Sequence, residues 1–210
     1  MSMKEEFIAL LRSTDRQGIE NVIEELGNIG AEQGLANFFE APASSRFHGN
    51  YAGGLVEHSL NVYHAAMAVR EAMIKIDPTV EADLPINSIV IASLLHDVCK
   101  GGIYKSVVKK QKNKEGYWVE VPGYDVDCSG FPLGHGEKSV ILLLKWGLRL
   151  TNEKMLAIRW HMHAWDLPFQ SYGIKSNFNA AKENCPLLAV IQAADGLAAH
   201  ILERDSITKP

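Results

Sequence analysis

Six polar side chains in this sequence occupy positions where a predicted helix would direct them toward the protein core or place them at the end of the helix. They are His58, His96, Asp97, His135, His161 and Asp195. Burying such groups is costly unless they are paired or bind a metal. Imidazoles and carboxylates gathered in a helical core are typical ligands of first-row divalent metals. The set therefore indicates a metal site, and its histidines favour Mn, Fe, Co, Ni or Zn over Mg or Ca.

The segment 186–203 shows how a helix would position one of these groups. Its apolar residues recur every three or four positions, and Asp195 interrupts the stripe that Leu188, Ile191, Ala198 and Leu202 would bury. A carboxylate on that face needs a strong partner. His200 and Glu203 are predicted on the opposite, solvated face.

Two earlier helices are predicted to carry further members of the set. In the helix expected over 55–76, His58 shares the buried side with Leu55 and Val62. The helix expected over 88–99 is apolar nearly all round, which predicts a central position. Its C-terminal end carries His96 and Asp97, and adjacent residues of a helix can face one ion only at such an end or between helices.

The rest of the chain predicts a mostly helical fold with one β-hairpin. The hairpin is expected over 104–126, where β-favouring residues flank the turn Asn113–Gly116. Other helices are expected over 4–12, 17–27, 136–147 and 152–164. The predicted fold class is all-α, with a small β-hairpin inserted.

Composition limits the classes of protein that need be considered. The chain has 210 residues and a net charge of −4, which argues against a protein that binds extended duplex nucleic acid. Its three cysteines form no CxxC pair, so neither a disulfide scaffold nor a cysteine zinc site is expected. Apolar runs are too short for a membrane helix, and the start Met-Ser-Met-Lys-Glu-Glu does not suit a signal peptide. We therefore expect a cytoplasmic protein with no membrane partner.

In order and spacing, these residues resemble the HD-domain metal-dependent phosphohydrolases, especially bacterial and phage members related to HD-type 3′–5′ exoribonucleases. A His-Asp dipeptide alone would mean little, but here it lies between an upstream histidine and a downstream aspartate. The resemblance runs from about residue 44 to about residue 203. It rests on the segments GGLVEHSL (53–60), SLLHDVCK (93–100), LGHGEKS (133–139) and AADGL (193–197).

The resemblance implies a helical HD domain over 41–205, preceded by a helical extension, 1–40, packed on it. It implies one or two divalent metal ions per chain. His58, His96, Asp97 and Asp195 would be the core ligands, while His135 and His161 would hold a second ion bridged by Asp97. Lys100 is similar to a family lysine that contacts phosphate; alternatively, it is an ordinary cation at a helix end.

The chemistry that suits such a site is attack of water on a phosphoester. A metal lowers the pKa of water and withdraws charge from the phosphoryl oxygens, and Asp97 could orient the nucleophile. Residues 100–114 hold six lysines and no acid, which indicates either a solvated hairpin or a basic lid for an anionic substrate. Candidate substrate contacts are Arg46, His48, Tyr51, Lys105 and His163.

The resulting hypothesis is a hydrolase acting on a nucleotide or short oligonucleotide. Two alternatives stay open: a 3′–5′ exoribonuclease, and a non-catalytic metal-containing module that senses nucleotides. The sequence does not indicate the oligomeric state.

Overall fold

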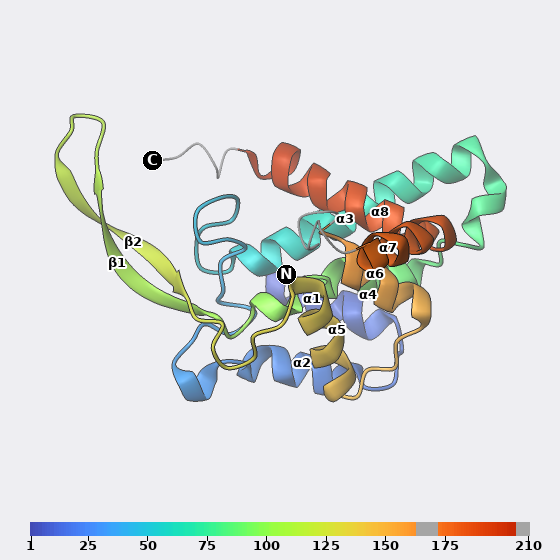
Figure 1. Cartoon of the computed structure of the whole chain (residues 1–210), viewed down its shortest axis with the longest axis horizontal. Coiled ribbons are helices and arrows are strands. Elements are labelled where there is room, and N and C mark those ends of the chain that lie inside the picture. The colour runs from blue at the N-terminus through green and yellow to red at the C-terminus, as the bar shows by residue number, and fades with distance from the viewer. Residues whose placement is uncertain (163–171, 205–210) are drawn as a thin grey trace.

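The computed structural model describes residues 1–162 and 172–204 of the chain, and it confirms the predicted all-α fold with one β-hairpin (Figure 1). Short 3-10 turns lie at Ala31–Gln33, Pro78–Glu81 and Val98–Lys100. The helices are α1 (Met3–Ser13), α2 (Ile19–Asn28), α3 (Gly54–Ile76), α4 (Ile86–Leu95), α5 (His135–Lys145), α6 (Asn152–Trp160), α7 (Tyr172–Asn184) and α8 (Pro186–Leu197).

Helix α4 lies at the centre of the helical body. It is buried without interruption from Ser88 to Leu95, as its apolar sequence predicts. Helices α3 and α8 pack against it and against each other, and α6 contacts both α4 and α8. The elements predicted to carry the polar set are therefore neighbours in space.

The two N-terminal helices share this core. Phe7 and Leu11 of α1 and Val22 of α2 are fully buried in the same apolar cluster as α4. Helix α1 contacts α3 and α4 directly. This packing suits a helical extension of the body, although the boundary near residue 40 stays a prediction.

The hairpin projects from the helical body as a twisted two-stranded ribbon (Figure 1). Strands β1 (Tyr104–Lys112) and β2 (Trp118–Val126) pair antiparallel over their whole length. At the turn, the Asn113 side-chain oxygen accepts hydrogen bonds from two backbone N–H groups, and Gly116 adopts φ +88°. Most of the ribbon is exposed, but Tyr104 at its base is buried in the core.

Several boundaries differ from the sequence prediction. Helix α4 ends at Leu95 instead of 99, and α8 ends at Leu197, where a π-helical turn, Ala198–Leu202, takes over. Helix α6 ends at Trp160 instead of 164. Helix α7 was not predicted; its first half contains Gly173, Ser176, Asn177 and Asn179, which are poor helix formers.

Within the described ranges, no single helix is long and apolar enough to cross a membrane. The segments Gly173–Asn184 and Pro186–Leu202 reach the required length and composition only when taken together, and they bend by 100° where they join.

Candidate metal centre

The structure brings all six members of the predicted ligand set together around Asp97. The two carboxylate oxygens of Asp97 divide the cluster between them. Oδ1 faces the Nε2 atoms of His135, at 2.5 Å, and His161, at 3.4 Å. Oδ2 faces the Nε2 atoms of His96, at 3.3 Å, and His58, at 3.8 Å, and Asp195 Oδ1 lies 3.2 Å from His58 Nε2.

The end of α4 explains how two adjacent residues face one centre. The α-helix stops at Leu95, and the chain passes through Asp97 (φ −109°, ψ 20°) into the turn Val98–Lys100. This break in the helix lets the side chains of His96 and Asp97 point to the same place. The sequence argument allowed such an arrangement either at a helix end or between helices.

Two histidine rings are oriented by contacts of their Nδ1 atoms with backbone carbonyl groups. His96 Nδ1 lies 2.8 Å from the Ser93 carbonyl oxygen, and His161 Nδ1 lies 2.7 Å from that of Ile158. A carbonyl oxygen can only accept, so Nδ1 carries the proton and Nε2 presents its lone pair to the centre. Within the described residues, the buried Nε2 atoms of His58, His96 and His161 have no hydrogen-bond partner.

Buried imidazole nitrogens without partners, facing carboxylates, are the environment that a divalent cation satisfies. Three groups of three have ligand atoms within 4.8 Å of one another within the described residues. Two of them share Asp97: His58, His96 and Asp97, and Asp97, His135 and His161; the third is His48, His58 and Glu203. The donor set around Asp97 therefore fits a divalent metal.

A close helix contact holds the second group together. His135 begins α5 and His161 caps the end of α6, and these two helices pack together. A Cβ atom at Gly136 would lie only 2.1 Å from the backbone oxygen of Arg159. Glycine at 136 is therefore a steric requirement for the approach of His135 to His161.

Glu203 is a functional candidate that the sequence argument placed on the wrong face. Its carboxylate is buried, lies 3.1 and 3.2 Å from His58 Nδ1, and accepts a 2.9 Å hydrogen bond from Asn61. The π-helical turn Ala198–Leu202 explains the error. Each residue there turns through a smaller angle than in an α-helix, so Glu203 returns to the face of Asp195. Apolar periodicity carries no signal for such a turn.

The charges of the cluster shift the pKa values of its members in opposite directions. Burial disfavours the charged form of His58, but the nearby carboxylates of Asp195 and Glu203 outweigh it and raise its pKa to about 9. For His135, burial is likewise outweighed by Cys99 and Asp97, which raise the pKa to about 10. Burial also opposes ionisation of Asp97, yet the charges of Lys100, His96 and His135 hold its pKa well below the usual range.

A cavity of about 240 Å³ opens onto this cluster. Its lining includes Asp97, His161 and Asp195, together with Lys100 and His48. Lys100 Nζ lies 2.7 Å from Asp97 Oδ2, so an ammonium group stands at the edge of the centre. The cavity is thus lined by both the candidate ligands and a cation suited to a phosphate group.

One of the predicted substrate contacts, His48, lies at the cavity, and three others lie outside its lining. His48 lines the cavity, and its ring stacks 4.8 Å from that of His58. Burial, and then the charge of His58, lowers the pKa of His48 to about 4. Arg46, Tyr51 and Lys105 are exposed and do not belong to the described lining; the Tyr51 hydroxyl donates to Glu57 instead. His163 lies outside the described residues.

Comparison with known proteins agrees with this geometry. A family model described as HD domain matches residues 55–200, well over half of the chain, and the match spans all six clustered residues. No curated protein and no solved structure matches the chain. Members of the family are generally metal-dependent phosphohydrolases. Because the family model covers more than half of its length, the chain belongs to the HD-domain family.

Proposed function

We propose that this protein is a divalent-metal-dependent phosphohydrolase that cleaves a phosphoester of a nucleotide or short oligonucleotide. The observation that carries the proposal is the cluster of buried histidine Nε2 atoms around Asp97 that have no hydrogen-bond partner within the described residues, beside a cavity that Asp97, His161 and Lys100 line. A non-catalytic sensing module would not need ligands exposed to a cavity in this way.

In this proposal, His58, His96, Asp97 and Asp195 hold one metal ion, and Asp97, His135 and His161 hold a second. The metal supplies activation of water and charge withdrawal from the phosphoryl group. Lys100 binds a phosphoryl oxygen, since its ammonium group lies beside Asp97 and lines the cavity. The depressed pKa of His48 keeps its ring neutral near pH 7, so its unpaired Nε2 can hydrogen-bond to the substrate.

The test combines elemental analysis of the purified protein with hydrolysis of a panel of mono-, tri- and cyclic nucleotides and short RNAs. We expect the wild type to contain a first-row metal and to hydrolyse at least one class. Asp97→Asn should lose both metal and activity, because Asp97 touches every histidine of the cluster. Asp83→Asn, which changes an exposed carboxylate of the same type, is the matched control. Full activity in a metal-free Asp97→Asn protein would refute the proposal.

A 3′–5′ exoribonuclease is a second candidate, favoured by the exposed surface of the ribbon. Tyr117 and Trp118 are 71% and 67% exposed near the turn, and Lys112 Nζ lies 5.5 Å from the Trp118 ring. Exposed aromatic rings and lysines are typical of surfaces that bind single strands by stacking and charge. Arg46 and Lys105 would then contact the strand outside the cavity.

Shortening the ribbon distinguishes the two candidates. Val107 pairs with Gly123, so removing 108–122 and joining these residues through an Asn-Gly turn keeps the register of the base. An exoribonuclease should lose its salt-sensitive RNA affinity, whereas a hydrolase of mononucleotides should keep its kcat/KM. Unchanged RNA binding by the shortened protein would eliminate the exoribonuclease.

A further inference from the structure

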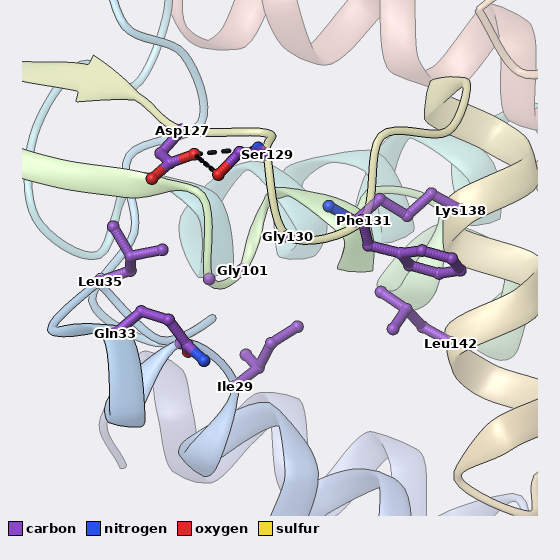
Figure 2. A pocket seen from close by; sticks show the side chains of 12 residues that line it. Ile29, Gln33, Leu35, Gly101, Asp127, Ser129, Gly130, Phe131, Lys138 and Leu142 are labelled. Carbon is purple, nitrogen blue, oxygen red and sulfur yellow. Dashed lines mark hydrogen bonds between the residues drawn. The ribbon is translucent and has the colours of Figure 1, made fainter.

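Figure 2 shows a second cavity, of about 250 Å³. It is lined by residues between 29 and 35, which follow α2, by the segment 127–131 after β2, and by Lys138 and Leu142 of α5. Its floor includes Gly101 and Gly102, which directly follow Lys100. It shares no lining residue with the metal cavity among the described residues, so it is a separate site.

Lys138 of α5 is the unusual group in this cavity. Figure 2 shows its side chain reaching toward Gly130 along one wall, and the residue is only 8% exposed. Within the described ranges, its ammonium group forms no hydrogen bond and no ion pair, and its one charge contact is with the ring of Phe131, 5.9 Å from Nζ. Nζ is not among the fully buried polar atoms of the described residues, although most of the side chain is buried. The ammonium group therefore has no anion beside it, and an anionic occupant of the cavity would pair with it.

Other lysines of the chain show what Lys138 lacks. Lys100 pairs with Asp97 at 2.7 Å, and Lys109 pairs with Asp125 at 3.2 Å. The backbone beside Lys138 also has spare donors, because the N–H groups of Gly130 and Phe131 make no hydrogen bond within the described part of the chain. Gly130, Phe131 and Lys138 line the same cavity, so these donors and a positive charge are available to one occupant.

The remaining walls restrict the size and charge of an occupant. Ile29, Leu35 and Leu142 present apolar side chains to the cavity, which suits an apolar body. Asp127 lies across the cavity from Lys138 (Figure 2), and its second carboxylate oxygen would repel further negative charge. This arrangement disfavours polyanions such as nucleoside triphosphates or a nucleic-acid backbone.

We propose that this cavity binds a small organic carboxylate, with its carboxylate group at Lys138 and its apolar body against Ile29, Leu35 and Leu142. The site is independent of the metal centre and of the reaction proposed there. Because Gly101 forms part of its floor, an occupant also contacts the chain next to Lys100.

The test measures binding of phenylacetate to the full chain by isothermal titration calorimetry. We expect saturable binding of one molecule per chain, and binding at least tenfold weaker for 2-phenylethanol, which has the same ring but no charge. Lys138→Met should weaken phenylacetate binding by about tenfold or more, the usual cost of losing a hydrogen bond to a charged group. Lys145→Met is the matched control, because Lys145 Nζ lies 5.4 Å from the same Phe131 ring but outside the cavity.

A second measurement locates the ligand without any variant. Phenylacetate should shift the amide NMR signals of Gly101, Gly102 and Gly130 in the wild type and leave that of Gly34 unchanged. Absence of binding to the wild type in the millimolar range would overturn the proposal. Equal affinity of Lys138→Met and Lys145→Met, or shifts confined to residues of the metal cavity, would overturn it as well.

Discussion

Replacing Glu203 with glutamine tests whether a carboxylate behind His58 strengthens metal binding. Glutamine keeps the side-chain length and an oxygen that can accept from His58 Nδ1, now at 3.1 Å, but it removes the negative charge. Loss of such an outer partner of a ligating histidine typically weakens metal affinity 10- to 100-fold, or about 1.4 to 2.7 kcal/mol. We therefore expect weaker binding of Mn²⁺ by Glu203→Gln in a protein that still folds.

Thermal unfolding converts this loss into a measurable shift. At a Mn²⁺ concentration of about 100 times the wild-type Kd, binding should stabilise the wild type by about 2.7 kcal/mol. For a chain of this length that raises Tm by roughly 5–11 °C. In Glu203→Gln the same concentration should give only about 0.4–1.4 kcal/mol, or roughly 1–6 °C.

Glu57→Gln is the matched control for this experiment. Glu57 is the neighbour of His58 in the chain, but its carboxylate accepts a hydrogen bond from Tyr51 and makes no described contact with the His58 ring. Its metal-induced shift should equal that of the wild type. If Glu203→Gln binds Mn²⁺ within twofold of the wild type while its metal-free circular dichroism is unchanged, Glu203 does not act through His58 and the reasoning is refuted.

Three further outcomes follow from the site. The pKa values of His58 and His135 are raised to about 9 and about 10, so both residues hold protons near pH 7 in the metal-free protein. Binding of Mn²⁺ should therefore release protons, and its affinity should increase as pH rises toward that range. Calorimetry in buffers of different ionisation enthalpy measures the release, and binding without proton release would contradict the prediction. Gly136→Ala should lower the free energy of unfolding by about 1–3 kcal/mol and reduce the amount of bound Mn²⁺, because a Cβ atom would lie 2.1 Å from a backbone oxygen of α6. Urea titration and elemental analysis measure the two effects, and unchanged values would show that α5 can shift to accommodate the Cβ atom. Lys100→Met should lower kcat/KM about 10- to 100-fold on the best substrate of the panel while the metal stays bound, and equal kcat/KM would remove Lys100 from the proposed site.

The inward-facing ligands are predictable because helical spacing reports which face of a helix a residue occupies. Leu188, Ile191 and Asp195 share a face in the sequence, and Asp195 does lie beside His58 in the structure. The apolar run before His96 likewise predicts the burial of α4. Spacing does not report which helices become neighbours, so the meeting of α3, α4 and α8 around Asp97 had to be inferred from the need of these inward polar groups for partners and from the family resemblance.

Two features escaped prediction for physical reasons. The π-helical turn that brings Glu203 inward changes the angle per residue, which a fixed period cannot anticipate. Helix α7 packs against α8, but its glycine, serine and asparagine residues favour loops in an isolated sequence, so local propensity argued against a helix there. The pairing of the ribbon was easier, because its turn residues and β-branched strands are local signals.

The ligands of the centre come from helices that lie far apart along the chain, with His58 on α3 and Asp195 on α8. A chain emerging from the ribosome would present the first histidines long before the last carboxylate is made. Full coordination of a metal ion would have to wait until α8 has docked, so metal loading would be a late event that reports completed folding. An ion held by His58 and Asp195 would then also link α3 to α8.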